Sequence, residues 1–345
     1  MILLTGANGH LGANLARRLL KDGATMRVLL RRASDNSTVE GLAVERAYGD
    51  LRDPASLLAA CRGCDAIYHC AAQLSTVAGG EQQLFANNVL GTRNLLDAAA
   101  KNGVRRVVVS GSLSATGHRW EGPTDETEPF DPFEEHLPYA RTKAAVEHEC
   151  LKAVAGGLDV VIAVSCAILG PNDFKPSRMG QLLLNYAHGR LRAYVPGGFE
   201  FVAAADIVEG HLLAMTHGRS GEKYIFSTQF MTVSDLLALY GEVTGRPNHA
   251  LCVPAALLEP VARIGEFAHR HLKIGGRQLL TPAAIRLLRL ERRADCSKAR
   301  SELGYHSGSI ADAVRDAYDG FVSRGLIERR QSFAVRSLES ERTKA

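Results

Sequence analysis

Short apolar strands alternate with amphipathic helices through the first half of the chain, and this alternation restricts the fold more than any other feature. Runs rich in valine, isoleucine and leucine are typical of parallel strands that helices cover on both faces of a sheet. Right-handed crossovers between them predict an α/β fold with a doubly wound parallel sheet. The expected strands lie at 1–6, 26–32, 45–50, 66–72, 106–112 and 160–169, and the expected helices at 11–23, 56–63, 87–103 and 139–157.

The first strand runs into a glycine-rich turn, TGANGHLG, which opens the first helix. In this G-x-x-G-x-x-G spacing, Gly6 allows a tight turn, Gly9 lets the backbone approach a pyrophosphate, and Gly12 lets the helix sit close to the sheet. The free N–H groups at the helix N-terminus then face the phosphates. Because a strand precedes the turn and an amphipathic helix follows it, we expect a dinucleotide-binding Rossmann core.

The rhythm changes after residue 170, where helical segments dominate and strand candidates become short. We therefore predict a Rossmann core over 1–170 and a smaller, mostly helical, substrate-binding portion over 171–327, some of whose segments can return to the core. The second portion should cover the carboxyl ends of the strands, where open α/β sheets bind ligands. Residues 328–345 are highly charged with few large apolar side chains, and we expect a mobile tail.

The composition excludes several classes of protein. A net charge of +4 is spread along the chain without a basic stripe, so no nucleic-acid partner is expected. The N-terminus lacks the pattern of a signal peptide, and no apolar run approaches the ~18 residues of a membrane span. Seven cysteines without framework spacing indicate a reducing cytoplasm. Cys61 and Cys64 form a C-x-x-C without a second pair, so no metal site is expected.

The end of the second strand indicates which dinucleotide is bound. NAD-selective sites place an acidic residue there to bond the ribose hydroxyls, whereas this chain has Arg31 and Arg32. Since a guanidinium fork suits a phosphate, NADP(H) is favoured, and NAD(H) stays the alternative. Asp50 ends a further strand and could accept a hydrogen bond from the adenine amine, with Leu51 over the ring.

These motifs together resemble the extended short-chain dehydrogenases/reductases, the NAD-dependent epimerase/dehydratase family. TGANGHLG, GDLRD, HCAA, NNVLGTRNLL, SGS and YARTK occur in the family order, and the resemblance covers roughly residues 1–325. The stretches LGPNDFKPSRMGQLLLNYAHGRLRAYV, SGEKYIF and DCSKARSELGY are most similar to one branch of the family. It holds dihydroflavonol-4-reductase-like proteins, 3β-hydroxysteroid dehydrogenases and hopanoid-associated sugar epimerases.

The resemblance implies that Ser112, Tyr139 and Lys143 are the catalytic residues. Tyrosine is a weak acid with a reference pKa of about 10, and we expect the ammonium one helical turn away to lower that pKa. Ser112 would bond the substrate oxygen, and Asn88 would support the site or only pack its helix. His69 is interpreted as a packing residue. By the same resemblance the cofactor-binding residues are Thr5, Gly6, Asn8, Gly9, His10, Leu11, Gly12, Arg31, Arg32, Asp50, Leu51, Ala71, Ala72, Tyr139, Lys143 and Cys166.

Two departures from the family pattern bear on the substrate. Many relatives have Asn-Pro after the sixth strand, where this chain has Ser165 and Cys166, so nicotinamide contacts differ there. Sugar-nucleotide epimerases tend to carry a diphosphate-binding arginine at the place of Phe199. Phe199, Phe201 and Val202 are instead interpreted as an apolar wall, although core packing would explain them equally well.

The sequence therefore predicts an NADPH-dependent oxidoreductase that interconverts a carbonyl and an alcohol on a fairly apolar small metabolite. The alternative is a nucleotide-sugar epimerase or dehydratase with retained NAD(P). A non-catalytic dinucleotide sensor is disfavoured, since regulators of this fold tend to lose the tyrosine or the lysine. A homodimer through the helices beginning near Asn88 and Tyr139 is implied by the resemblance alone. The segment 253–276 could form an amphipathic helix that touches a membrane, but a surface helix fits its charges at least as well, and no stable insertion is expected.

Overall fold

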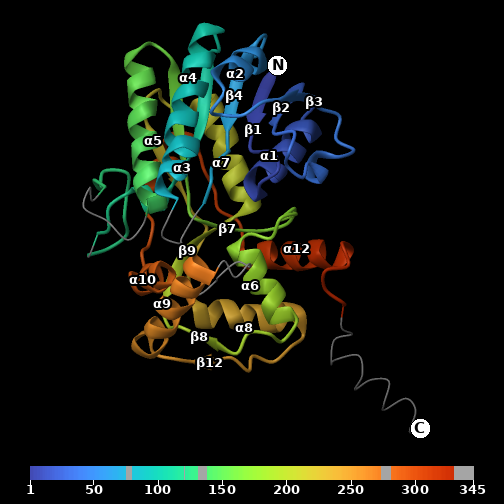
Figure 1. The fold of residues 1–345 in the computed structure, drawn as a ribbon, viewed down its shortest axis with the longest axis vertical. Helices are drawn as coiled ribbons and strands as arrows, with labels where there is room; N and C mark the ends of the chain where they lie inside the picture. Colours follow the sequence, from blue (N-terminus) through green and yellow to red (C-terminus); the bar gives the residue numbers. More distant parts are fainter. Residues whose placement is uncertain (75–79, 120, 131–137, 273–280, 330–345) are drawn as a thin grey trace.

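The computed structural model of the protein describes residues 1–74, 80–119, 121–130, 138–272 and 281–329, with side chains throughout except at 268–272. Residues 330–345 of the expected tail lie outside this range. A seven-stranded parallel sheet with the order β10-β6-β5-β4-β1-β2-β3 forms the upper half in Figure 1, which confirms the predicted doubly wound fold. Its strands are β1 (Ile2–Thr5), β2 (Met26–Leu30), β3 (Glu45–Tyr48), β4 (Ala66–His69), β5 (Arg106–Ser112), β6 (Asp159–Ser165) and β10 (Lys223–Phe226).

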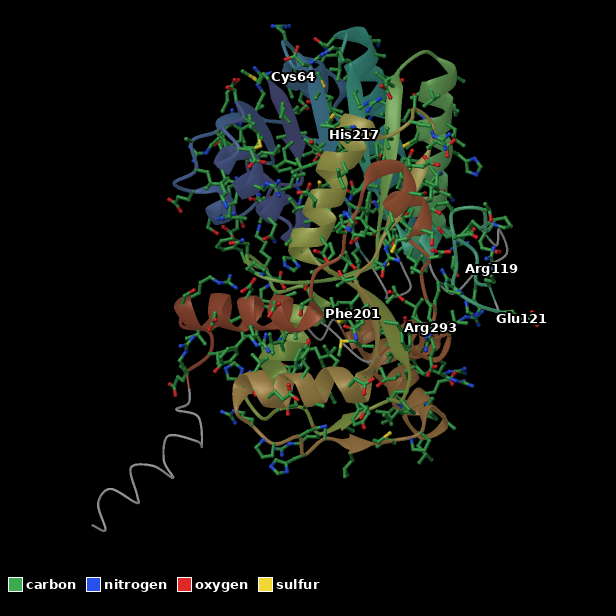
Figure 2. The ribbon with its side chains drawn as sticks, turned by 180° about the vertical axis from the view of Figure 1, so that it is seen from behind. Cys64, Arg119, Glu121, Phe201, His217 and Arg293 are labelled. Atoms are coloured by element: carbon green, nitrogen blue, oxygen red, sulfur yellow. The ribbon has the colours of Figure 1, made fainter. Side chains whose placement is uncertain are left out.

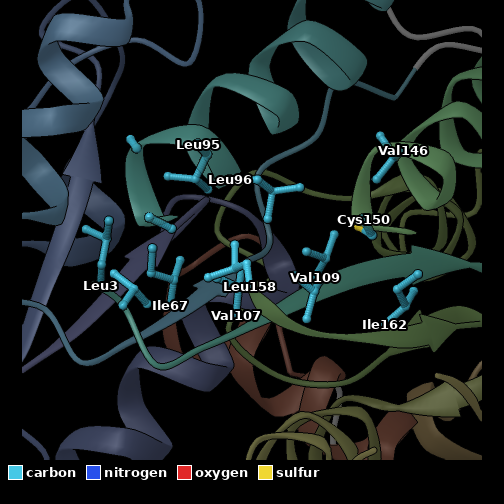
Figure 3. Packing of buried hydrophobic residues seen from close by; sticks show 14 of the residues in the cluster. Leu3, Ile67, Leu95, Leu96, Val107, Val109, Val146, Cys150, Leu158 and Ile162 are labelled. Carbon is cyan, nitrogen blue, oxygen red and sulfur yellow. The ribbon is translucent and has the colours of Figure 1, made fainter. Parts of the chain in front are cut away.

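Helices cover both faces of this sheet, because each apolar strand presents buried side chains to two sides. One face packs against α2 (Pro54–Cys61), α4 (Gly91–Lys101) and α5 (Pro138–Ala155). Figure 3 shows this layer, with Leu95 on α4 and Val146 on α5 facing Val107 and Val109 of β5. The other face packs against α1 (His10–Lys21), α7 (Ala204–His217) and α11 (Ser297–Leu303).

The long helix predicted over 87–103 is one part of a longer helical run. The longer run consists of α3 (Glu81–Phe85), a single π turn η2 (Ala86–Leu90) and α4. The short 3-10 turns η1 (Ser37–Val39) and η3 (Leu113–Ala115) follow β2 and β5. The π turn contains Asn88, and single π turns within helices are often found at functional sites.

The strand predicted over 160–169 is divided at Cys166, so this part of the prediction is wrong. β6 pairs with β5 up to Ser165, opposite Ser112, which is the last residue of β5. Beyond that residue neither neighbouring strand continues. The chain bends, and β7 (Ala167–Leu169) pairs with β9 (Gly198–Ala203) in a second, three-stranded sheet completed by β11 (Gln229–Thr232).

The second half carries this small sheet and a separate hydrophobic core. α6 (Arg178–Ala187), α8 (Val233–Thr244) and α12 (Ile310–Ser323) enclose that core. At the lower end in Figure 1, β8 (Ala193–Tyr194) pairs with β12 (Leu251–Cys252), beside α9 (Ala255–Leu272) and α10 (Pro282–Arg289). Figure 2, seen from behind, places Phe201 and Arg293 near the junction of the two halves.

Several segments beyond residue 170 belong to the Rossmann half rather than to the substrate portion. β10 is buried on both faces and adds a parallel edge strand beside β6, while α7 and α11 cover the sheet. In Figure 2 His217, at the end of α7, lies against the upper sheet. The chain therefore crosses between the halves several times, and the cavity at their junction is built from residues distant in sequence.

Candidate active site

A cavity of about 410 Å³ lies where the carboxyl ends of β4, β5 and β6 meet the second half. This is the edge at which open α/β sheets bind ligands. Predicted site residues from several elements line it together: His10, Leu11, Ala72, Ser112, Tyr139, Lys143 and Cys166. The remaining predicted residues, which include Asp50 and the two arginines at 31 and 32, do not line this cavity.

Lys143 is the most enclosed member of the predicted catalytic set. It is 5% exposed on α5, and its Nζ donates a 2.7 Å hydrogen bond to the carbonyl oxygen of Ser110 on β5. The Ser112 hydroxyl lies 2.8 Å from the Ser114 hydroxyl. Because a hydroxyl can turn toward a new acceptor, Ser112 remains able to donate to a substrate oxygen. The three side chains thus share one cavity, and the Ser112 hydroxyl interacts with the Tyr139 phenol.

The pKa values of this set differ from the sequence-based expectation. Burial raises the pKa of Tyr139 to about 12, and the Ser112 hydroxyl acts in the opposite direction. Burial also lowers the pKa of Lys143 to about 8. The expectation of a lowered phenol pKa is therefore wrong for this structure, where the pKa of Tyr139 is raised. The reason is physical: burial removes the phenolate from water, and the Ser112 hydroxyl offsets this cost only in part.

The glycine-rich turn has the shape that a dinucleotide needs. Gly6 has φ +78°, and a Cβ there would lie 2.5 Å from the Ala71 backbone nitrogen. A Cβ on Gly12 would collide with the Gly6 carbonyl oxygen. The first turn of α1 carries no acidic residue, so its N-terminus favours an anion. Among the described residues, the buried Asn8 Oδ1 and His10 Nδ1 have no hydrogen-bond partner. These features fit a bound dinucleotide.

The residues predicted to bind the adenine and its ribose lie at the ends of β2 and β3. Arg31 and Arg32 are exposed, and the Arg32 guanidinium lies 4.4 Å over the Tyr48 ring. Asp50 forms two hydrogen bonds with Arg52, at 2.9 and 3.0 Å, which hold the pKa of its carboxyl below the usual value. Sequence reasoning missed this ion pair. It already engages the carboxylate that we assigned to the adenine amine, and that assignment stays a prediction.

Asn88 ties three segments of the site together. Its side chain bonds the backbone of Gln73 in both directions, accepting at 2.7 Å and donating at 2.9 Å. It also donates to the Thr142 hydroxyl at 3.1 Å, one residue before Lys143. The residue is 2% exposed. Of the two interpretations left open by the sequence, these contacts favour support of the site, because they link the loop after β4 to the helix of Tyr139.

His69 connects this support to the glycine turn. The Thr92 hydroxyl donates to the Asn88 carbonyl at 2.6 Å, so His69 Nε2 must be the donor to Thr92 at 2.9 Å. His69 Nδ1 then accepts from the Thr5 hydroxyl at 2.6 Å. The residue is buried, and burial lowers its pKa to about 3. The packing role expected from the sequence agrees with this neutral, doubly bonded imidazole.

His211 is a buried contributor that sequence reasoning missed. Its Nδ1 lies 2.7 Å from the Ile207 carbonyl, which can only accept, so Nε2 accepts from the Ser110 hydroxyl at 2.8 Å. The carbonyl of this same Ser110 holds Lys143. Burial lowers the pKa of His211 to about 4, and the Lys143 charge acts in the same direction. In the sequence this histidine stands within an amphipathic pattern, GHLLA, and nothing there distinguishes it.

His211 makes stability dependent on pH in a defined window. The unfolded chain binds its proton near pH 6.5 and the folded chain near pH 4, so stability rises with pH between these values and is lost as pH falls. The contribution approaches ~1.4 kcal/mol per pH unit inside the window. We expect His211→Asn to lose stability at pH 7 and to show a shallower slope between pH 6 and 4.5, measured by urea unfolding. An unchanged slope would contradict this assignment.

The wall of the cavity opposite the sheet is largely apolar. It includes Leu74 after β4, Met179 on α6 and Phe199 on β9, while α10 and the residue after it add Ala284, Leu287 and Leu290. The apolar wall that we expected is therefore present at Phe199, whereas Phe201 and Val202 are core residues. Cys166 lines the cavity as well, and burial raises the pKa of its thiol.

Three charged residues of the cavity, Arg178, Glu200 and Arg292, were not anticipated. Arg292 donates from Nη1 to the carbonyls of Leu113 and Thr116, at 2.9 and 2.8 Å. Glu200 accepts hydrogen bonds from the Ser227 hydroxyl and the Ala294 backbone, and burial raises its pKa. Arg292 stands in an ordinary charged run, LERRAD, so the sequence offered no signal for it. Arg292 and Glu200 therefore hold backbone segments beside the cavity, at Leu113 and Thr116 and at Ala294 respectively.

The described residues contain no group of three or more metal-ligating side chains, and no described helix meets the length and hydropathy of a membrane span. Cys61 and Cys64 are buried free thiols, and burial raises the pKa of Cys61 to about 12. The C-x-x-C motif is therefore part of the core packing.

Taken together, the parallel sheet, the glycine turn and the cavity at the strand ends define a dinucleotide-dependent enzyme of the Rossmann class. The NAD dependent epimerase/dehydratase family model matches residues 2–226, and the chain belongs to this family. The chain is 43% identical over 325 residues to sterol demethylase protein B of Methylococcus capsulatus, covering 94% of this chain and 99% of that protein.

Two further comparisons extend this result. A 4-hydroxy-2-methyl-3-oxo-4-farnesyl-3,4-dihydroquinoline-1-oxide ketoreductase of Stigmatella aurantiaca is 30% identical, with 91% of this chain and 95% of that protein covered. The crystal structure of DesIV, a dTDP-glucose 4,6-dehydratase from Streptomyces venezuelae with NAD and TYD bound, superposes with a TM-score of 0.76. It is 25% identical and covers 95% of this chain and 98% of that one.

Proposed function

We propose that the protein is an NADP(H)-dependent carbonyl reductase, or the reverse dehydrogenase, for a fairly apolar small metabolite. One observation carries the proposal: Ser112, Tyr139 and Lys143 line a single cavity whose opposite wall is apolar. The carbonyl of such a substrate would point to the hydroxyls, and its hydrocarbon part would contact the wall from α10.

Each catalytic side chain has a distinct task in this proposal. Ser112 donates a hydrogen bond to the substrate oxygen and holds it in place. Tyr139 supplies the proton as the alkoxide develops, and its raised pKa keeps it protonated at neutral pH. Lys143, with one N–H bonded to Ser110, keeps two donors for cofactor ribose hydroxyls and stabilises negative charge on the phenol oxygen. Asn88 and His211 are positioning residues for the helix and the lysine.

The cofactor, when bound, supplies or accepts the hydride. Its pyrophosphate would lie against the turn at Gly6, Gly9 and Gly12, where the N-terminus of α1 favours the negative charge. The unpartnered Asn8 Oδ1 and His10 Nδ1 are acceptors, because His10 Nε2 faces the carbonyl oxygens of Gly170 and Pro171, so they suit a hydroxyl of the cofactor and not its phosphates. Cys166 would lie near the nicotinamide in place of the family proline, where its small, neutral thiol leaves room for the ring.

The names of the relatives support an apolar substrate. One relative is named for sterol demethylation and another for reduction of a ketone with a farnesyl chain. The apolar wall formed by Phe199 and by Leu287 and Leu290 near α10 suits such molecules.

The proposal is tested by ketone-dependent oxidation of NADPH with the purified protein. We expect turnover with cyclic or long-chain apolar ketones, with the rate rising as the apolar part grows. Loss of NADPH absorbance and formation of the alcohol should match one to one. Absence of turnover in both directions across such a series, with the cofactor bound, would overturn the proposal.

A second function, nucleotide-sugar epimerase or dehydratase with retained cofactor, is favoured by one observation: Arg292 lines the cavity and carries a charge suited to a diphosphate. Against it, this guanidinium already donates to two backbone carbonyls. An enzyme of this kind would purify with cofactor bound and convert a nucleotide sugar without net consumption of NAD(P)H.

Arg31 is proposed to select NADP(H) through its charge on the 2′-phosphate, with Arg32 stacked on Tyr48 beside it. We expect Arg31→Ala to raise the KM for NADPH by about 10- to 100-fold and to leave the KM for NADH almost unchanged, because a hydrogen-bonded ion pair contributes about 1.5–3 kcal/mol. Steady-state kinetics with both cofactors measures this. Arg62→Ala, an exposed arginine at the end of α2, is the control, and an equal effect on both cofactors would contradict the role.

The remaining expectations are also proposals. Helices α4 and α5 would form the homodimer interface implied by the family, where Leu151 of α5 is 49% exposed. Seven free cysteines, five of them outside the cavity, suit a reducing cytoplasm. The division at residue 170 is kept as a functional one, between cofactor and substrate portions.

A further inference from the structure

Helix α9 presents a row of large apolar side chains to solvent. Leu257 is 66% exposed, Val261 56% and Ile264 69%, and their spacing of four and three places them on one helical face. Phe267, three residues further on, is 64% exposed. Single exposed apolar residues are ordinary on protein surfaces, but a row of four along one face indicates a contact surface.

The other face of the same helix is packed against the protein. Ala262 is buried with Val195 and Ile285, and Leu258 packs on this cluster. Ile285 lies on α10, whose Ala284 and Leu287 line the cavity. The helix is therefore held firmly from behind, and its exposed row is separated from the candidate active site by only one helix.

A basic border adjoins the start of this row. Leu251 on β12 is 70% exposed, and its backbone N–H donates to the Arg192 carbonyl at 2.9 Å. The two segments that bring these strands together, 188–195 and 245–253, contain Arg190, Arg192 and Arg246 and no acidic residue. Within α9 itself, Arg263 is paired with Glu259 at 2.7 Å and Glu266 is a second acidic residue, so the basic charge comes from the border and not from the helix.

We propose that Leu251 and the exposed face of α9, which we call the α9 surface, dock onto an anionic lipid surface. An amphipathic helix with a large apolar face inserts that face at the boundary between headgroups and acyl chains, and neighbouring arginines bind the anionic headgroups. The 18 residues of α9 would lie in the plane of the bilayer. Pro260 lies within this helix and is exposed as well.

Charge decides between a lipid surface and a second copy of the chain. A two-fold interface brings the same patch from both copies together, so it would gather two sets of three arginines at one contact. An anionic lipid surface instead complements them. Docking would also place the α10 wall of the cavity close to the bilayer. Only this consequence rests on the proposed function, which it deepens. An apolar substrate could then pass from lipid to cavity with little exposure to water.

The test is cosedimentation of the full chain with two kinds of vesicle, phosphatidylcholine alone and phosphatidylcholine with phosphatidylglycerol. We expect binding to the anionic vesicles, weaker binding to the neutral ones, and loss of the difference at about 0.5 M salt, where charges are screened. The double variant Leu257→Ser, Ile264→Ser should bind at least about tenfold more weakly, since it removes two apolar groups from the interface. Leu58→Ser, on α2 at the opposite end of the molecule, is the matched control and should bind as the wild type does.

Each other outcome overturns the proposal. Absence of wild-type binding, equal binding by wild type and double variant, or equal loss in the control would each do so. So would a change from dimer to monomer in the double variant without lipid, which would assign the α9 surface to a second copy. Circular dichroism confirms that the variants fold. Because sedimentation needs no catalysis, failure of the carbonyl reductase proposal leaves this result interpretable.

Discussion

Tyr139→Phe is expected to lower ketone-dependent NADPH oxidation by about 10²–10⁴-fold while NADPH binding is retained. The substitution removes one hydroxyl, the proton donor, and keeps the ring that occupies this part of the cavity. General acid catalysis by a positioned side chain contributes a factor of this size. The loss should appear in kcat rather than in KM, because the hydroxyl acts mainly as charge develops on the substrate oxygen.

A second tyrosine serves as the matched control for this prediction. Tyr240 on α8 is fully buried outside the cavity, and among the described residues its hydroxyl has no hydrogen-bond partner. Tyr240→Phe should therefore leave kcat unchanged and cost no stability. Stopped-flow or steady-state absorbance of NADPH measures the rates, and titration of protein fluorescence measures cofactor affinity. Equal rates for Tyr139→Phe and the wild type would exclude the mechanism.

Gly6→Ala is expected to reduce both stability and cofactor binding. An L-residue at φ +78° costs roughly 1–2 kcal/mol. The new Cβ would also lie 2.5 Å from the Ala71 nitrogen, and such overpacking adds about 1–3 kcal/mol. Because the Ala71 backbone must move, the turn that faces the pyrophosphate changes shape, and we expect NADPH affinity to fall by at least about tenfold.

Gly23→Ala separates the two costs. Gly23 also has φ +78°, but nothing lies within 4 Å of its added Cβ. It should lose only the roughly 1–2 kcal/mol of backbone strain and keep its affinity for NADPH. Urea unfolding compares the stabilities, and fluorescence titration compares the affinities. Identical losses in the two variants would show that the contact with Ala71 has no role.

Much of the Rossmann half follows from local sequence. The strands that end in Thr5, His69 and Ser112 are short apolar runs, α1 is clearly amphipathic, and α5 begins at Pro138. The glycine turn could be located because its tight backbone geometry depends on residues close together in the chain. YARTK could be located because its tyrosine and lysine are four residues apart. The break at Cys166 could not be found, since an apolar run carries no mark for the residue at which its partner strands end.

The environment of residues in the small sheet of β7, β9 and β11 could not be predicted from local sequence either. β9 reads as an apolar stretch in which Phe199 and Phe201 share one face, but only the tertiary structure buries Phe201 in the core and leaves Phe199 at the cavity. Arg292 and α10 come into the cavity from far along the chain, and nothing in their own residues indicates that destination.

The sequence by itself determined the class of fold, the position of the dinucleotide turn and the identity of the tyrosine and lysine on one helix, because each depends on residues close together in the chain. Only the tertiary structure decided what surrounds them. It placed His211 behind Ser110, set the Asn88 bonds to two distant segments, and raised the pKa of Tyr139 instead of lowering it. Burial and long-range hydrogen bonds depend on residues that are far apart in the sequence, so no local pattern predicts them.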